Sequence, residues 1–202
     1  MSQLSSLQTE IQNKTDVGSE YNTKITEAIN QTQNEINSIR FEFLLANATF
    51  NTSSTVYEYD LESDFFMPDV FYVYTGTTTR LIKASYEAIY LTWTLTDARG
   101  VPGYYALKDA SGTSDVPVVY IGRPIADTNY SIRYTYYKKL SDLSNATDES
   151  MISKVYGDAP LVKGAIWKMW KTLENDAEAT KAFEEYQGEL ILMQQSLPVR
   201  RW

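Results

Sequence analysis

The first fifty residues alternate apolar and polar positions with the spacing of an α-helix. A first helix is predicted from the spacing of Leu4, Leu7 and Ile11. The segment Asp-Val-Gly-Ser at 16–19 then interrupts the pattern. A second helix is predicted from Ser19, a favourable N-cap residue, to near Asn47, where threonine and asparagine become frequent. Its apolar face carries Tyr21, Ile25, Ile29, Ile36 and Ile39.

From about residue 50 to residue 140 the pattern changes to short runs of β-branched and aromatic residues separated by turn residues. Such runs are typical of strands. Strands are predicted at 55–61, 70–74, 80–84, 104–107, 116–121 and 130–137. The segment 85–95 fits either a short helix or a strand. The spacing of the runs predicts a small antiparallel sandwich or barrel.

Helical periodicity returns in the last third of the chain. A short helix is predicted to start at Thr147 or Asp148 and to run through Tyr156. The next helix follows Asp158 and has Pro160 in its first turn, where proline is tolerated. Its apolar face carries Val162, Ile166, Met169 and Leu173.

The last predicted helix begins at a possible capping box, formed by Asn175 and Glu178, and Pro198 stops it. Its apolar face carries Ala179, Phe183, Tyr186, Leu190 and Met193.

These patterns predict an α+β protein. An isolated amphipathic helix is marginal in water, so the helices at the two ends of the chain must cover their apolar faces with one another. We therefore expect one discontinuous helical bundle built from residues 1–48 and 141–197. A small antiparallel β-domain of residues 49–140 is inserted into it, and residues 198–202 form a C-terminal tail.

The composition of the chain excludes several classes of function. The chain of 202 residues has no cysteine and no histidine, which removes thiolate and imidazole metal ligands and the commonest general base. We expect no cofactor and no metal. The net charge of −8, without a stripe rich in lysine and arginine, argues against tight binding to nucleic acid. No apolar run approaches the roughly 18 residues of a membrane span, so we expect no membrane partner and a protein made in a cytoplasm.

The densest group of carboxylates is Asp60, Glu62 and Asp64. Such a group could serve glycoside hydrolysis or a hard cation, but the central glycine and distal glutamate of a calcium loop are missing here. A solvated turn is the favoured interpretation. The Gly-Val-Pro-Gly segment at 100–103 has no following Lys-Ser/Thr, so it is interpreted as a turn before a strand rather than a phosphate loop.

Two features are typical of a partner-binding surface. Trp167 and Trp170 are separated by one helical turn and have lysines nearby, which fits either an exposed aromatic surface or core packing. The tail ends with Val199, Arg200, Arg201 and Trp202. Tryptophan and arginine are common at interface hot spots, and this tail either docks on a neighbouring protein or folds back.

The order of the segments resembles the phage head-to-tail adaptor family over nearly the whole chain. The matching elements include Gly-Val-Pro-Gly-Tyr-Tyr-Ala-Leu at 100–107 and Tyr-Ser-Ile-Arg-Tyr-Thr-Tyr at 130–136. Further matching segments are 36–39, 57–61, 121–127 and the helices around Ala165 and Phe183.

This resemblance implies a structural protein of the virion neck that catalyses no reaction. Such adaptors form a homo-oligomeric ring, typically dodecameric, between the portal protein and the tail or nozzle protein. The genome passes through the lumen without specific binding. The resemblance also implies assembly in the host cytoplasm, with the helical bundle toward the portal and the β-domain toward a neighbour or the tail.

Two other functions remain open from the residues alone. A receptor- or glycan-binding sandwich associated with a phage tail would use the same exposed aromatic and acidic residues, although it would not need helical flanks. A small carboxylate hydrolase would use Asp60 and Asp64.

Overall fold

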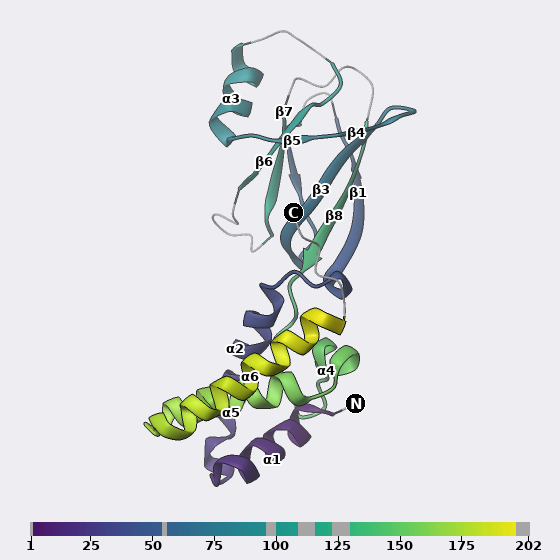
Figure 1. Ribbon diagram of the computed structural model, residues 1–202. Helices are drawn as coiled ribbons and strands as arrows, with labels where there is room; N and C mark the ends of the chain where they lie inside the picture. The colour runs from purple at the N-terminus through teal and green to yellow at the C-terminus, as the bar shows by residue number, and fades with distance from the viewer. Residues whose placement is uncertain (1, 54–55, 96–99, 109–115, 123–129, 197–202) are drawn as a thin grey trace. The chain divides into compact units, whose positions relative to one another are not determined.

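The computed structural model describes residues 2–53, 56–95, 100–108, 116–122 and 130–196. The chain divides into two compact units. The helical unit combines Met1–Leu44 with Leu140–Trp202, and the β unit is Leu45–Lys139. Figure 1 shows helices in the first and strands with one helix in the second. The predicted α+β class, with a β unit inserted into a helical bundle, is confirmed.

The described part of the helical unit contains α1 (Leu4–Thr15), α2 (Asn22–Asn37), α4 (Met151–Tyr156), α5 (Ala159–Thr172) and α6 (Asp176–Ser196). The central helix is α5, which contacts α1, α2, α4 and α6. Gly164 lets these helices approach closely, because a Cβ there would overlap the Thr32 side chain of α2 and lie 2.9 Å from the Tyr186 ring of α6. The packing therefore depends on the smallest residue at the crossing point.

Local signals explain where these helices begin. The Ser150 hydroxyl accepts a hydrogen bond from the Ile152 amide and caps α4. Pro160 lies in the first turn of α5, as predicted. The Asn175 side chain accepts a hydrogen bond from the Glu178 amide at 3.3 Å, which confirms the predicted cap of α6.

Polar side chains of α2 join the N-terminal part of the helical unit to its C-terminal part. The Asn30 amide group donates to the Leu143 carbonyl at 3.0 Å and accepts from the Leu143 amide at 2.9 Å. Gln33 donates to the Ser141 carbonyl at 2.8 Å and accepts from the Ser150 hydroxyl at 2.6 Å. We call these contacts of Asn30 and Gln33 the polar tie. They connect segments that lie more than a hundred residues apart in the sequence.

The described part of the β unit contains two four-stranded sheets. The first has the order β1 (Leu45–Asn51), β8 (Ser131–Lys138), β3 (Phe65–Tyr74) and β4 (Thr78–Arg80). The second has the order β2 (Glu58–Asp60), β7 (Val118–Gly122), β6 (Tyr104–Lys108) and β5 (Ile82–Lys83).

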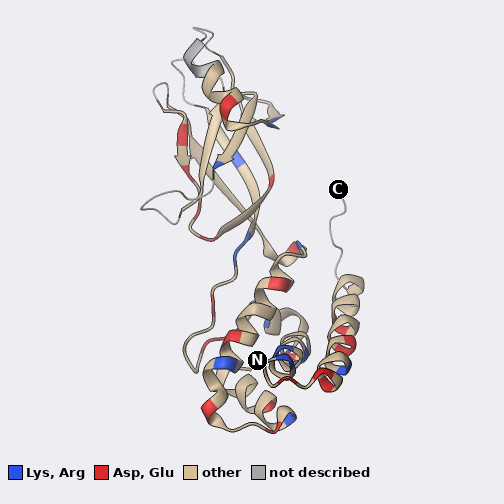
Figure 2. Ribbon diagram, turned by 90° about the vertical axis from the view of Figure 1, so that its left-hand side faces the viewer, with Lys and Arg blue, Asp and Glu red and all other residues tan. Residues whose placement is uncertain are grey.

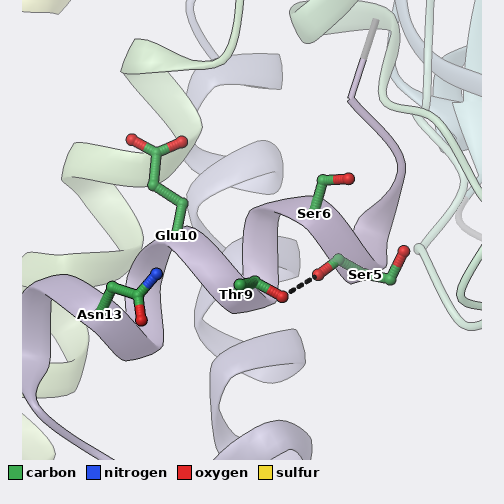
Figure 3. Close-up of a pocket in the computed structure, with 5 residues that line it drawn as sticks. All are labelled: Ser5, Ser6, Thr9, Glu10 and Asn13. Atoms are coloured by element: carbon green, nitrogen blue, oxygen red, sulfur yellow. Dashed lines mark hydrogen bonds between the residues drawn. The ribbon is translucent and has the colours of Figure 1, made fainter.

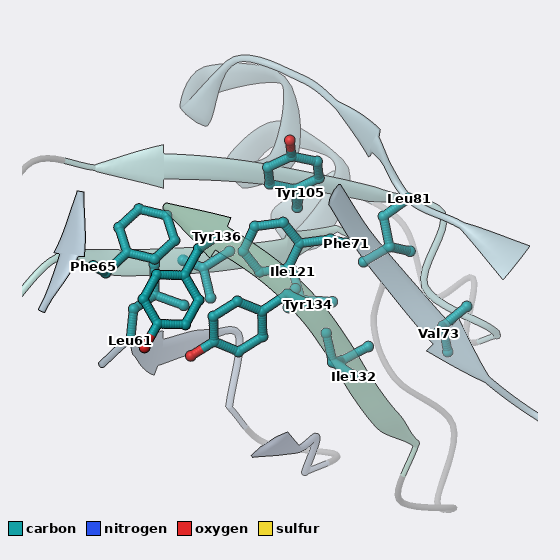
Figure 4. Close-up of a cluster of buried hydrophobic side chains, with 11 residues drawn as sticks. Leu61, Phe65, Phe71, Val73, Leu81, Tyr105, Ile121, Ile132, Tyr134 and Tyr136 are labelled. Carbon is teal, nitrogen blue, oxygen red and sulfur yellow. The ribbon is translucent and has the colours of Figure 1, made fainter. Parts of the chain in front are cut away.

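Aromatic side chains fill the space between the two sheets (Figure 4). The Phe71 ring stacks on Tyr134 with centroids 4.8 Å apart and lies 4.5 Å from Tyr105 of the other sheet. Helix α3 (Tyr86–Leu95) packs on β6 and β7, where Ile89 contacts Tyr120 in a second, smaller cluster. The predicted sandwich architecture is thus a face-to-face pair of sheets with a core of aromatic and aliphatic side chains.

The prediction that the second helix extends from Ser19 to near Asn47 was wrong at both ends. Helix α2 starts at Asn22, and Ser19–Tyr21 forms a short 3₁₀ helix instead. Helix α2 ends at Asn37, and Arg40 then adopts a left-handed conformation with φ 62°. The following segment forms strand β1 because it pairs with β8 along its whole length.

Other elements also differ from their predictions. The segment 85–95, left open between helix and strand, contains α3. The predicted strand at 80–84 is divided, since Leu81 bonds to Phe71 of the first sheet whereas Ile82 bonds to Gly103 beside the second. The sheets are not wholly antiparallel, because β5 pairs with β6 in parallel.

Candidate functional site

Trp167 packs inside the helical unit. Its ring centroid lies 4.7 Å from Phe183 and 5.9 Å from Tyr186, both on α6. The neighbouring Lys168 ammonium is 4.5 Å from the Trp167 ring and 2.5 Å from a Glu35 carboxylate oxygen. Trp167 is half-buried, so it contributes to packing and keeps an accessible edge.

That accessible edge of Trp167 lines a surface depression between α2 and α5. The charged groups of the depression are Lys24, Glu27, Lys168 and Lys171. Trp170 is half-buried on the same helix but does not line this depression. The two tryptophans therefore do not form one continuous aromatic surface, and partner binding by either stays a prediction.

The tail residues Val199, Arg200, Arg201 and Trp202 lie outside the described residues. The described chain ends at Ser196, which lines a hollow of about 530 Å³ between α4, the start of α5 and the end of α6. We call this hollow the terminal groove. It is lined by Val155, Tyr156, Pro160, Glu189, Leu192, Met193 and Ser196.

The terminal groove is rimmed by apolar side chains that remain in water in the single chain. Leu192 is 58% exposed and Val155 is 43% exposed, on opposite sides of the groove. Met151 of α4 and Ile191 of α6 are exposed as well, although neither lines the groove. Exposed apolar groups gathered around a hollow mark a surface that is covered when a partner binds. Sequence reasoning missed this groove, although Ile191 and Leu192 lie outside the predicted apolar face of α6.

A second apolar surface lies on the β unit. Ile82 of β5 is 60% exposed and is the cross-strand partner of Tyr104, which is also exposed. Tyr90 and Leu91 are exposed on α3, the helix that packs on β6 beside them. We call Ile82 and Tyr104 the β-unit apolar surface. Each unit therefore carries its own exposed apolar surface.

A further hollow, on helix α1, is polar. Its lining residues Ser5, Ser6, Thr9, Glu10 and Asn13 all come from α1 (Figure 3). The Thr9 hydroxyl donates to the Ser5 carbonyl at 2.9 Å, an ordinary contact within a helix. This surface offers no apolar anchor for a partner.

The acidic segment around Asp60, Glu62 and Asp64 is dispersed. Asp60 and Glu62 are exposed, whereas Asp64 accepts a hydrogen bond from the Tyr136 hydroxyl at 2.7 Å and lies 3.8 Å from Lys138. Burial and the Asp64 carboxylate together raise the pKa of Tyr136. Among the described residues, no group of three or more carboxylates is placed to hold a metal ion.

The segment 100–103 leads into β6, as the interpretation of a turn predicted. The Gly103 carbonyl accepts a hydrogen bond from the Ile82 amide at 2.9 Å and so aligns β5 with β6. The Gly103 carbonyl is thus hydrogen-bonded beside the sheet, so this segment serves as a turn before β6 rather than as a phosphate-binding loop.

The first half of α6 carries more exposed acidic residues than basic ones. Figure 2 shows red segments gathered there. The exposed carboxylates are Asp176, Glu178, Glu184 and Glu185, against one lysine, Lys181. Within the described parts of the chain, no helix has the length and apolar character needed to cross a membrane.

Comparison with known families gives a match over nearly the whole chain. The family model described as SU10 adaptor protein matches residues 2–201, which includes both units. No curated protein matches the chain.

Proposed function

The chain belongs to the SU10 adaptor protein family of phage adaptor proteins, and from this premise we propose that it forms a ring between the portal and the tail or nozzle proteins. In this role it is a structural component of the virion neck, assembled in the host cytoplasm. Nothing in the role requires a catalytic step, a cofactor or a membrane.

The observation that carries the proposal is the presence of one exposed apolar surface on each of two separate units. The terminal groove lies on the helical unit, and the β-unit apolar surface consists of Ile82 and Tyr104. A protein that connects two different partners needs two such surfaces. We assign the helical unit, with its tail, to the portal side, and the β unit to a neighbouring subunit or the tail proteins.

Ring formation requires contacts between different surfaces of identical subunits, because only a heterologous contact generates a closed ring. The 16 tyrosines of the chain suit this role, since tyrosine combines a large apolar face with one polar tip. We propose a homo-oligomeric ring, dodecameric by analogy with the resembling adaptors.

DNA passes through the lumen of the proposed ring without specific binding. With a net charge of −8, the subunit repels the phosphate backbone over the Debye length of about 8 Å at physiological salt. We propose that uncharged or acidic residues line the lumen. An assembled ring with a continuous lining of lysine and arginine would contradict this assignment.

Deleting residues 198–202 tests the assignment of the portal side. The proposal predicts that the shortened protein keeps its circular dichroism spectrum but decorates purified portal rings much less completely, as counted in negative-stain images. Gln187→Ala serves as the control, because Gln187 is exposed on α6 and belongs to neither apolar surface, so this variant should decorate portals like the intact protein. Equal decoration by the shortened and intact proteins would refute the docking of the tail on the portal.

A further inference from the structure

We propose that the chain's own C-terminal segment, residues 197–202, occupies the terminal groove in the free subunit and leaves it when the portal binds. The role of the portal in this exchange follows from the proposed function, whereas occupation of the groove by the segment stands without it.

The groove has the chemistry to hold a short apolar segment. Met193 forms a buried part of its lining, and the exposed Leu192 and Val155 stand at its sides. These three side chains come from α6 and α4, so a segment between them would be covered from two helices. Covering Leu192 and Val155 removes apolar surface from water, which is favourable.

One polar group of the groove also lacks a partner. The Tyr156 ring packs against Phe41 and Phe43, with centroids 5.6 and 5.5 Å away. Its hydroxyl is shielded from solvent and has no hydrogen-bond partner among the described residues. Burial raises the pKa of this hydroxyl, so it stays protonated and able to donate at neutral pH. Because the hydroxyl is shielded, a peptide carbonyl in the groove accepts from it only when the neighbouring side chains shift.

The length and composition of the segment identify it as the occupant. Six residues follow Ser196, which itself lines the groove, and an extended chain of that length reaches about 20 Å. Three of the six are apolar and large, namely Leu197, Val199 and Trp202.

Attachment to α6 favours the chain's own segment over one from a second copy. A segment joined to its site without a linker has an effective concentration in the millimolar range. Segments of other free subunits, present at micromolar concentration, are far more dilute than this. A contact of modest affinity is therefore sufficient for the attached segment to occupy the groove. A portal that binds the same segment must compete with the groove. The apparent affinity of the portal is therefore reduced in proportion to the fraction of subunits whose segment is free.

A single thiol reports whether the segment is covered. The chain has no cysteine, so Val199→Cys in the full-length protein introduces the only reactive thiol. Its rate of reaction with a disulfide reagent such as DTNB is measured in three proteins: Val199→Cys alone, with Leu192→Glu, and with Ile191→Glu. Leu192 and Ile191 are adjacent residues, 58% and 54% exposed, and of the two only Leu192 lines the groove.

We expect Leu192→Glu to speed the reaction about tenfold, since it places a charge where an apolar side chain docks. Ile191→Glu should leave the rate unchanged. Val155→Glu, on the opposite side of the groove, should repeat the effect of Leu192→Glu and guards against a local defect in α6. Circular dichroism confirms that each variant is folded.

Equal rates in all the proteins would overturn the inference. Protection that increases with protein concentration would also overturn it, because the occupant would then be the segment of a second copy. The assay contains no portal, so its failure leaves the proposed function intact. A protected thiol in a protein that never binds portals would instead refute the proposed function alone.

Discussion

The helical unit and the β unit solve the problem of a stable core in different ways. The β unit is one continuous segment, and its core between the two sheets combines stacked aromatic rings with aliphatic side chains. The helical unit is assembled from two segments separated by the whole β unit, and the polar tie joins them. In the β unit, paired strands align segments from across the unit, whereas in the helical unit buried side-chain hydrogen bonds from α2 join the two distant segments.

The largest expected effect comes from the aromatic core. Phe71→Ala should destabilise the β unit by about 3–5 kcal/mol, because it removes a fully buried ring and leaves a cavity between Tyr134 and Tyr105. Phe66→Ala is the matched control on the same strand, since Phe66 is exposed. Urea unfolding followed by far-ultraviolet circular dichroism should show an early loss of the β unit in the first variant only. Equal midpoints for both variants would contradict the assignment of the core.

Substitutions at two glycines test how tightly the helical unit is packed. Gly164→Ala should destabilise this unit by about 1–3 kcal/mol, because the new Cβ overlaps Thr32 and crowds Tyr186. Gly188→Ala lies in α6 with nothing within 4 Å of the new Cβ, so it should stabilise the protein by about 0.5–1 kcal/mol. Thermal unfolding of both variants measures the difference. Two shifts of the same sign would show that the crossing of α2, α5 and α6 is not tight.

The polar tie is tested by Gln33→Leu. This change leaves the buried Ser150 hydroxyl without its acceptor and the Ser141 carbonyl without its donor. We expect a loss of about 1–2 kcal/mol from the helical unit, since Ser141 is exposed and water can replace one of the two bonds. Gln31→Leu, at an exposed position of the same helix, should change the free energy of unfolding very little. A comparable loss in both variants would argue against a specific role for Gln33.

The smallest expected effect is a loss of stability at alkaline pH, caused by the ionisation of Tyr134. Burial, with a lesser contribution from the Glu62 carboxylate, raises the pKa of Tyr134 to about 12, above its ordinary value of 10.0. The folded state therefore favours the neutral phenol. Its contribution to stability is complete below pH 10 and is lost as the pH rises from 10 to 12. Between pH 10 and 12, the urea midpoint should fall less steeply with pH in Tyr134→Phe than in the unsubstituted protein. Identical slopes would refute the raised pKa of Tyr134.

Sequence reasoning succeeded where local signals decide the structure. Pro160 and Asn175 mark the starts of α5 and α6 because proline restricts its own backbone and asparagine caps the next amides. It failed for β1, because the partner of this strand is β8, more than eighty residues further along the chain. No local pattern around Ala46 or Ala48 contains that information.

The candidate site shows the same limit. The tail stays a prediction from the types of its residues. The terminal groove combines α4 with the end of α6, and only the tertiary packing brings them together. Ile191 and Leu192 carried a readable signal, since they are apolar residues outside the face that α6 buries. Their meaning depends on Val155, which lies in another helix.

The central claim is that this phage adaptor joins a portal on one side and tail proteins on the other. Electron microscopy of purified protein mixed with portal-bearing heads that lack it tests this most directly. The account predicts a closed ring of added density on the portal, with the β units accessible to tail proteins. Heads that stay bare at saturating protein concentration, or density attached away from the portal vertex, would contradict it.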